Sequence, residues 1–170
     1  HDAAPFYDQN DKKLYFTRNN HYRGRTITSK DGQVKLELYF ATYIDNKFTG
    51  VRPLSVNSKT YSVGQPTVSP DGNVLIFASD KPGGYGGIDL YYCVRKGNVW
   101  SNAKNLGPAI NTAGDELYPY MSPEGDLYFA SNFHPGFGGF DIFKSTRVEE
   151  YWTIPENLGM PVNSSQDVYA

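Results

Sequence analysis

The stretch Ser69-Pro70-Asp71-Gly72, followed by a run that ends Phe77-Ala78-Ser79, decides the fold because the chain repeats it. It returns as Ser122-Pro123-Glu124-Gly125 and Phe129-Ala130-Ser131. A period of about 50 residues filled with short aromatic and β-branched runs is typical of β-propeller blades, since one four-stranded unit cannot bury both its faces until neighbours stack on it. The repeat therefore predicts an all-β fold of stacked, four-stranded antiparallel blades.

Landmark residues keep one step along the chain. Phe48, Trp100 and Trp152 are spaced 52 residues apart. The same step relates Leu54, Leu106 and Leu158, and also Glu37, Asp89 and Asp141. The 170 residues therefore hold about three blades, whereas a closed propeller typically needs about four to eight.

We expect blades at about residues 2–60, 61–113 and 114–165, with the first strand of a fourth blade at 166–170. The chain has no initiator Met, and both of its ends match the same phase of the repeat. We therefore expect a part of a larger ring, such as a six-bladed one, completed by further blades of a longer chain or by a second copy.

Turn chemistry marks four strands, A to D, in each blade. In the middle blade Pro70 presets φ, Asp71 accepts local backbone bonds and Gly72 supplies a positive φ, so the chain reverses there. A meander of this kind places the BC and DA loops at one rim of the propeller and the AB and CD turns at the other. The expected strands are 65–68, 73–79, 89–95 and from 99 onward in the middle blade, 118–121, 127–131, 141–146 and from 152 in the third, and 5–7, 14–17 and 38–40 in the first.

Composition agrees with this class. Aromatic residues make up 15% of the chain and charged residues 20%, which favours strands and argues against disorder. A net charge of −2 gives no field that would attract nucleic acid or an anionic membrane, and the longest apolar run, 74–78, is too short to span a membrane. The single Cys93 excludes an internal disulfide and a multi-cysteine zinc site.

Features that occur in one blade only are free of the demands of the fold. The BC connection of blade 1 is nine residues longer than in the other blades, and residues 25–35 alternate around Asp31-Gly32 like a projecting β-hairpin. This insert is either a solvated loop or a docking element for an acidic partner or a neighbouring domain. Its basic residues are Arg18, His21, Arg23, Arg25, Lys30 and Lys35.

Two aromatic residues, Tyr85 and Phe137, lie at the tips of glycine-rich BC loops. An aromatic side chain flanked by glycines is either tucked over its blade or offered to a ligand. We expect the binding site on this rim, formed by these two residues with four from the insert, Arg18, His21, Arg23 and Arg25.

Residues that recur once per blade are expected to be structural. A repeated acid usually serves as an internal brace whose carboxylate accepts backbone N–H groups of a turn. We assign this role to Glu37, Asp89 and Asp141, together with Trp100 and Trp152. Asp89 and Asp141 should be buried, and a calcium ligand is the alternative role for these two.

The sequence shows no catalytic or cofactor motif. The glycine loops are not followed by Lys-Ser/Thr and a helix, so they are not phosphate-binding loops. Asp115 and Glu116 are adjacent rather than on separate strands as in glycosidases. His1, His21 and His134 lack metal-ligand spacing, and there is no Gly-x-Ser-x-Gly. We predict no enzymatic activity, no cofactor and no metal.

The repeat resembles the WD40-like, TolB-type β-propeller repeat, whose core reads roughly as Ser-Pro-Asp-Gly, a strand ending Phe-Ala-Ser, a Gly-Gly linker and Asp-Ile/Leu-Tyr. Residues 69–79 with 89–91 fit it fully, and 122–131 with 141–143 nearly so, whereas blade 1 departs at 8–11 and at Glu37. The glycine loop before Asp, the Trp that opens strand D and the Asn-Leu-Gly that follows are similar to a subset found in OmpA-like envelope proteins of the Bacteroidota. The peptidoglycan-tethered outer-membrane lipoprotein of the type IX secretion system is one such protein.

This resemblance implies a periplasmic, outer-membrane-associated protein whose partners are other envelope proteins or flanking domains. We expect a non-catalytic interaction scaffold. One alternative is a glycan- or peptidoglycan-binding propeller in which Tyr85 and Phe137 are stacking platforms. Another is the propeller domain of a carbohydrate-acting enzyme or a peptidase; a hydrolase would direct acids to the axis from strand A, where this chain has 66–68 and 119–121 instead.

Overall fold

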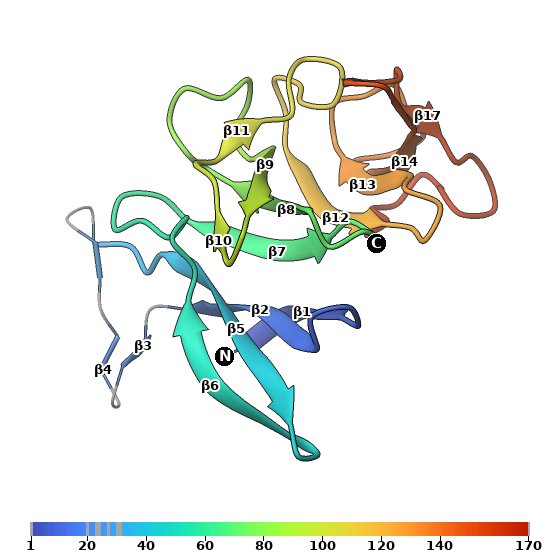
Figure 1. Ribbon diagram of the computed structural model, residues 1–170. Helices are drawn as coiled ribbons and strands as arrows, with labels where there is room; N and C mark the ends of the chain where they lie inside the picture. The colour runs from blue at the N-terminus through green and yellow to red at the C-terminus, as the bar shows by residue number, and fades with distance from the viewer. Residues whose placement is uncertain (1, 20, 23–24, 27, 30–31, 170) are drawn as a thin grey trace.

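The computed structural model describes residues 2–19, 21–22, 25–26, 28–29 and 32–169. All secondary structure in these ranges is β, and the strands form antiparallel sheets that follow one another along the chain (Figure 1). Three of these sheets are the blades, so the predicted all-β fold of four-stranded blades is confirmed.

Blade 1 is a meander in the order β1-β2-β5-β6. A separate two-stranded ladder of β3 and β4 lies within its BC connection. The bounds are β1 (Asp2–Asp8), β2 (Lys13–Asn19), β3 (His21–Tyr22), β4 (Arg25–Thr26), β5 (Leu36–Ile44) and β6 (Lys47–Pro53).

Blade 2 is formed by β7 (Val63–Val68), β8 (Val74–Ser79), β9 (Asp89–Lys96) and a strand D in two short pieces, β10 (Val99–Trp100) and β11 (Lys104–Asn105), both paired with β9. Blade 3 has the order β12-β13-β14-β17. Its outer corner is the small ladder β15–β16. The bounds are β12 (Glu116–Met121), β13 (Leu127–Ser131), β14 (Asp141–Ser145), β15 (Arg147–Val148), β16 (Tyr151–Trp152) and β17 (Glu156–Asn157).

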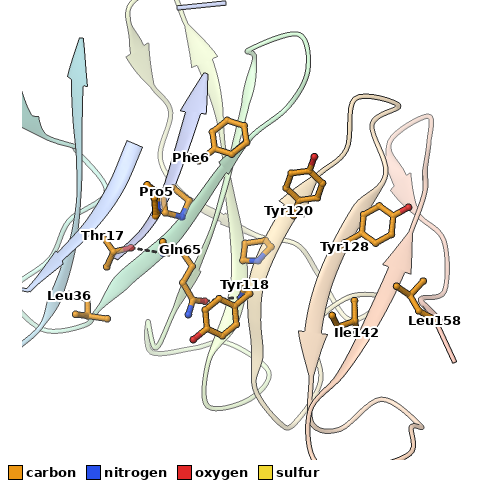
Figure 2. A pocket seen from close by; sticks show the side chains of 13 residues that line it. Pro5, Phe6, Thr17, Leu36, Gln65, Tyr118, Tyr120, Tyr128, Ile142 and Leu158 are labelled. Atoms are coloured by element: carbon orange, nitrogen blue, oxygen red, sulfur yellow. Dashed lines mark hydrogen bonds between the residues drawn. The ribbon is translucent and has the colours of Figure 1, made fainter. Parts of the chain in front are cut away.

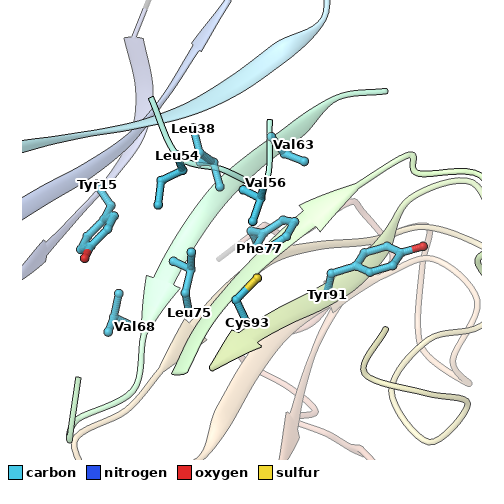
Figure 3. Close-up of a cluster of buried hydrophobic side chains, with 10 residues drawn as sticks. All are labelled: Tyr15, Leu38, Leu54, Val56, Val63, Val68, Leu75, Phe77, Tyr91 and Cys93. Atoms are coloured by element: carbon cyan, nitrogen blue, oxygen red, sulfur yellow. The ribbon is translucent and has the colours of Figure 1, made fainter. Parts of the chain in front are cut away.

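The core lies between the blades. Successive side chains of a strand point to opposite faces of its sheet, so β8 contributes to two clusters. Leu75 and Phe77 pack against blade 1, in the cluster shown in Figure 3, and Ile76 and Ala78 pack against blade 3. Burial on both faces of blade 2 explains why β8 reads as a near-continuous apolar run at residues 74–78.

Each blade carries one stacked aromatic pair across strands B and C. In blades 2 and 3 the pair is buried against the preceding blade, whereas alternation turns the pair of blade 1 away from blade 2. The ring centroids are 6.1 Å apart in Phe16–Tyr39, 6.3 Å in Phe77–Tyr91 and 6.1 Å in Phe129–Phe143.

Strand A of every blade is interrupted by a bulge before a proline. Ala4, Gln65 and Tyr118 have φ of 46°, 55° and 51°, and the register shifts at each of these points. These bulges connect neighbouring blades, because Gln65 N–H donates to Thr17 Oγ1 (2.8 Å) and Tyr118 N–H donates to Gln65 Oε1 (2.8 Å). The cost of a left-handed non-glycine residue is thus offset by hydrogen bonds between blades.

Two expectations about the chain's outline are wrong. The hairpin of the insert is formed by β3 and β4, not by residues 25–35. A turn does close between Ser29 and Gln33 (Ser29 N–H to Gln33 O, 2.8 Å), but no strand pairing flanks it in the described part of the insert. Residues 166–169 form no strand, because a strand A needs a strand B beside it and none of the described strands pairs with these residues.

Candidate interaction face

The BC loop of blade 2 is held by a buried carboxylate. Asp89, at the start of β9, is 1% exposed and accepts hydrogen bonds from the backbone N–H of Tyr85 (2.6 Å) and Gly86 (3.0 Å). Asn105 of strand D donates to the same carboxylate (2.8 Å). A Cβ at Gly84 would collide with it, which explains the glycine.

Blade 3 repeats this arrangement. Asp141 is also 1% exposed and accepts from the backbone N–H of Phe137 and Gly138, while Asn157 lies 3.5 Å from it. The predicted burial and backbone hydrogen bonds of Asp89 and Asp141 are confirmed. Trp100 and Trp152 pack partly buried against the two core clusters, one at each blade junction. That these residues stabilise the fold remains a prediction, tested below.

Sequence reasoning missed a second set of braces on this rim. Asn111, 2% exposed in the DA loop, accepts from Leu90 N–H (2.8 Å) and donates to Leu90 O (2.9 Å), so it pairs with the backbone of strand C like another strand. Asn163 does the same to Ile142 in blade 3, and Asn57 to Leu38 in blade 1. Asn111 and Asn163 are one 52-residue step apart, which is the signal that could have found these two, whereas Asn57 lies two residues out of that phase.

The BC and DA loops meet on one rim. Gly87 N–H donates to Gly114 O (3.0 Å), and Asp115 accepts from Ile88 N–H (2.8 Å). The chain end repeats the contact, since Asp167 accepts from Phe140 N–H (2.9 Å). We call this surface, formed by residues 80–88, 107–115, 132–140 and 159–167, the BC/DA face.

Aromatic side chains project from this braced backbone. Tyr85 and Phe137 are 50% and 54% exposed, so neither ring is tucked over its blade. Phe133, which sequence reasoning also missed, is 62% exposed and lies beside Gly114. It stands where blade 2 has Lys81, so the signal was an aromatic residue that does not repeat. Exposed rings on a fixed backbone are suited to contact with a partner, because little rotamer entropy is lost on binding.

The insert of blade 1 differs from the expectation. The Arg18 guanidinium lies over the rings of Phe16 and Tyr39, 5.2 and 5.1 Å from their centroids, so it caps the outward aromatic pair rather than projecting. Lys35 is only 5% exposed and is not a projecting charge either. His21 is the first residue of β3, and Arg25 is the first residue of β4. Arg23 and Lys30, which were also predicted as basic residues of this insert, lie outside the described residues.

The role of Glu37 as a loop brace stays a prediction, because part of its loop lies outside the described residues. Within the described residues its carboxylate accepts one hydrogen bond, from Tyr39 OH (2.8 Å). The insert stands where the other blades have the glycine loop, and none of its described amides is recorded as a donor to Glu37, as two loop amides are to Asp89. Among the described residues of blade 1, the brace of the kinds described above is Asn57.

The remaining chemistry is limited in the described part of the chain. No group of three or more His, Cys, Asp or Glu side chains there could hold a metal ion. Cys93 is fully buried, and burial raises the pKa of its thiol to about 11, so the thiolate is scarce at neutral pH. No helix among the described residues is long and apolar enough to cross a membrane.

An apolar groove of about 790 Å³ runs along strands A and onto the outer face of blade 3 (Figure 2). Prolines and aromatic rings of the three strands A form its floor. Tyr128, Ile142 and Leu158 extend it over the face of blade 3 that has no neighbouring blade. The floor residues include Pro5, Phe6, Pro66, Tyr118, Pro119 and Tyr120.

Known structures share this fold. No family model and no curated protein sequence matches the chain. A puromycin hydrolase variant complexed with PGG has a TM-score of 0.60 at 14% identity, over 91% of this chain and 22% of that one. A puromycin-hydrolyzing peptidase of Mycobacterium tuberculosis has a TM-score of 0.58 at 15% identity, over 94% and 23%.

A protein described as TolB from Agrobacterium tumefaciens has a TM-score of 0.55 at 15% identity, over 90% of this chain and 47% of that one. The chain therefore spans less than a quarter of the peptidase chains and about half of the TolB chain. At these identities the likeness shows the fold alone. The chain has the fold of a β-propeller, represented by three blades.

Proposed function

We propose that this propeller is a non-catalytic interaction module that binds a protein partner through its BC/DA face. The observation that carries the proposal is that Tyr85, Phe133 and Phe137 are exposed. They lie on BC loops in which backbone amides, such as those of Tyr85 and Phe137, donate to buried side chains. Rigid repeats whose loops present exposed side chains on one face are typical of binding scaffolds. Aromatic residues are also enriched where proteins contact each other.

The cell envelope is the proposed setting. The resemblance of residues 69–79 and 122–131 to the TolB-type repeat supports it, as does the likeness in fold to the TolB chain. The Asp after the glycine loop, the Trp that opens strand D and the Asn-Leu-Gly that follows are similar to a pattern in OmpA-like envelope proteins. This similarity favours an outer-membrane or periplasmic complex, and we propose the type IX secretion system as that complex. The partner would then be another envelope protein or a neighbouring domain.

A glycan or peptidoglycan fragment is the second candidate ligand, because the same exposed rings are suited to stacking against sugars. The third candidate, a propeller domain of a hydrolase, is favoured by the likeness in fold to two peptidases. Against a carboxylate-based active site, strand A lines the groove with Gln65 and Pro66 of blade 2 and with Tyr118, Pro119 and Tyr120 of blade 3.

Site-specific photo-cross-linking tests the proposal. A photoreactive amino acid at position 85 or 137, in the cells that make the protein, should yield the same discrete protein adduct from both positions. Position 151 is the matched control, because Tyr151 is an aromatic residue that is 76% exposed on the opposite rim. Adducts from all three positions alike, or competition by purified muropeptides that abolishes the adduct, would contradict protein binding at this face.

A further inference from the structure

Glu116 is a fully buried acid directly beneath the BC/DA face, and no role above uses it. It opens β12 and is 0% exposed. Its carboxylate accepts from Thr112 N–H (2.9 Å), Thr112 Oγ1 (2.5 Å) and Ser131 Oγ (2.8 Å). A buried, hydrogen-bonded carboxyl is costly to place and calls for an explanation.

The fold does not require an acid at this place. Glu116 pairs with Ser131 as Val63 pairs with Ser79 in blade 2. At the chain end Val168 N–H donates to Phe140 O (2.8 Å), just as Glu116 N–H donates to Ile88 O (2.7 Å). Valine therefore serves at two equivalent places, and Glu116 is a feature of the junction between blades 2 and 3 alone.

The carboxyl ties together the two loops that meet at this junction. Thr112 belongs to the DA loop, whose Gly114 O receives the N–H of Gly87 beside the Tyr85 tip. Ser131 ends β13, and its Oγ accepts from Phe133 N–H (3.2 Å) at the start of the next BC loop. If the DA loop opens, Glu116 meets water and both aromatic segments lose their support.

Both protonation states of the closed site can be satisfied. Two of the three partners are hydroxyl groups, which can rotate to donate to a carboxylate or to accept from a carboxylic acid. Burial disfavours the charged form and favours the acid, because a buried anion loses its hydration. Solvent reverses this preference once the loop is open.

The charges around Glu116 are few. Burial raises the pKa of Glu116 above its usual 4.5, against the opposing effects of the bonds from Thr112 and Ser131 and of His134 in the BC loop. Asp115 directs its carboxylate to Ile88 N–H and Asn132, and Asp89 of β9 is turned to its own glycine loop.

We propose that Glu116 is a proton-linked latch of the BC/DA face, in which the closed arrangement of the loops between blades 2 and 3 holds a proton that the open arrangement releases. Closure thus takes up a proton. The stabilisation is present in full below pH 4.5 and is lost as the pH rises through the raised pKa of the closed state. Its role in regulating a partner rests on the proposed function, because only then is the closed face the binding face.

Hydrogen exchange tests the latch on the whole chain without any partner. After correction for intrinsic rates, the protection of the Thr112 and Gly87 amides should fall between pH 4 and pH 8. Between the low-pH and high-pH limits, the protection factor should fall about tenfold for each unit by which the pKa of Glu116 in the closed state exceeds its pKa in the open state. The Glu116→Gln variant should show protection that does not change with pH, and Glu116→Val, which copies Val63, keeps the test valid if the amide variant folds poorly.

Glu124→Gln is the control, since it removes an exposed acid of the AB turn on the opposite rim and should leave the fall in place. A fall that persists in Glu116→Gln, or no fall in the unsubstituted chain, would overturn the latch. A latch that works while positions 85 and 137 yield no partner adduct would instead refute the proposed function and leave the latch standing.

Discussion

The BC loops of blades 2 and 3 are nearly the same structure, whereas blade 1 solves the same connection differently. In blades 2 and 3 a buried Asp gathers the amides of a glycine loop, and an aromatic residue stands exposed at the tip. Blade 1 has a longer insert, and its Glu37 meets only Tyr39 OH among the described residues. A buried residue that recurs with its contacts reports on the fold, so the exposed residues of the loops and the residues without counterparts are those to examine for function.

The aromatic pairs differ in the same way. Phe77–Tyr91 and Phe129–Phe143 are covered by a preceding blade, whereas Phe16–Tyr39 is turned outward and covered by Arg18. A cation over the rings shields them from water in part but does not replace a packed sheet. The outward faces of blades 1 and 3 are therefore the surfaces that a complete ring would bury.

The largest expected effect on stability comes from substitutions that remove packing between the blades. Phe77→Ala and Phe129→Ala should each lower the free energy of unfolding by about 3–5 kcal/mol, because a fully buried ring leaves a cavity between two sheets. Phe16→Ala should cost less, since its face has no neighbouring blade to lose. Urea unfolding measures all three; equal losses would mean that the outward face of blade 1 is also packed in solution.

The next largest effect on stability distinguishes the loop braces of blades 2 and 3 from Glu37 of blade 1. Asp89→Ala and Asp141→Ala should each lower the free energy of unfolding by about 1–3 kcal/mol, because buried amides lose their acceptor. Glu37→Ala should cost about 1 kcal/mol or less, the net value of one hydrogen bond. Thermal unfolding of the three variants checks this, and Asp variants that melt like the unsubstituted chain would remove the brace from the account.

A smaller effect concerns the AB turn of blade 1, where Asp11 forms an ion pair with Arg95 of blade 2. Burial raises the pKa of Asp11, but hydrogen bonds from Lys13 and Arg95 outweigh it and hold the pKa below 3.8. Asp11 therefore stabilises the fold above that pH, and the stabilisation is lost as the pH falls through its lowered pKa.

The salt dependence of stability should differ between this turn and the AB turn of blade 2. The stability difference between the unsubstituted chain and Asp11→Asn should shrink in high salt, because the partners are charged and partly exposed. Asp71→Asn should show little salt dependence, since the pKa of Asp71 is lowered by hydrogen bonds from the neutral Ser69 and Asn73. Denaturant titrations at low and high salt would contradict this if both variants responded alike.

Much of the scaffold could be predicted from the sequence because turn chemistry and side-chain alternation are local. Strand B of blade 3 was predicted at 127–131 and is Leu127–Ser131. The insert was placed wrongly because an Asp-Gly turn specifies a reversal but not which residues pair beside it. The fourth strand failed for a related reason, since a strand A forms only against a strand B.

The candidate face was predicted in part. Tyr85 and Phe137 stood out as single aromatic residues among glycines, and the structure leaves both exposed. Phe133 and the paired asparagines were missed because their roles depend on which loops meet, as with Asn111 and Leu90. Whether Arg18 projects could not be decided from charge alone, since cation–π contacts compete with solvent for its side chain.

The smallest effect on stability carries the central claim that the exposed aromatic residues of the BC/DA face bind a partner. One paired measurement tests it most directly: the melting temperature and the affinity-purification yield of the partner identified by cross-linking, for Tyr85→Ala/Phe137→Ala, with Tyr151→Ala as control. We predict that each of the two substitutions changes the free energy of unfolding by no more than about 0.5 kcal/mol, but that the double variant no longer binds the partner. Tyr151→Ala should keep both its stability and its partner. A double variant that still captures the partner, or that melts as early as Asp89→Ala, would contradict the account.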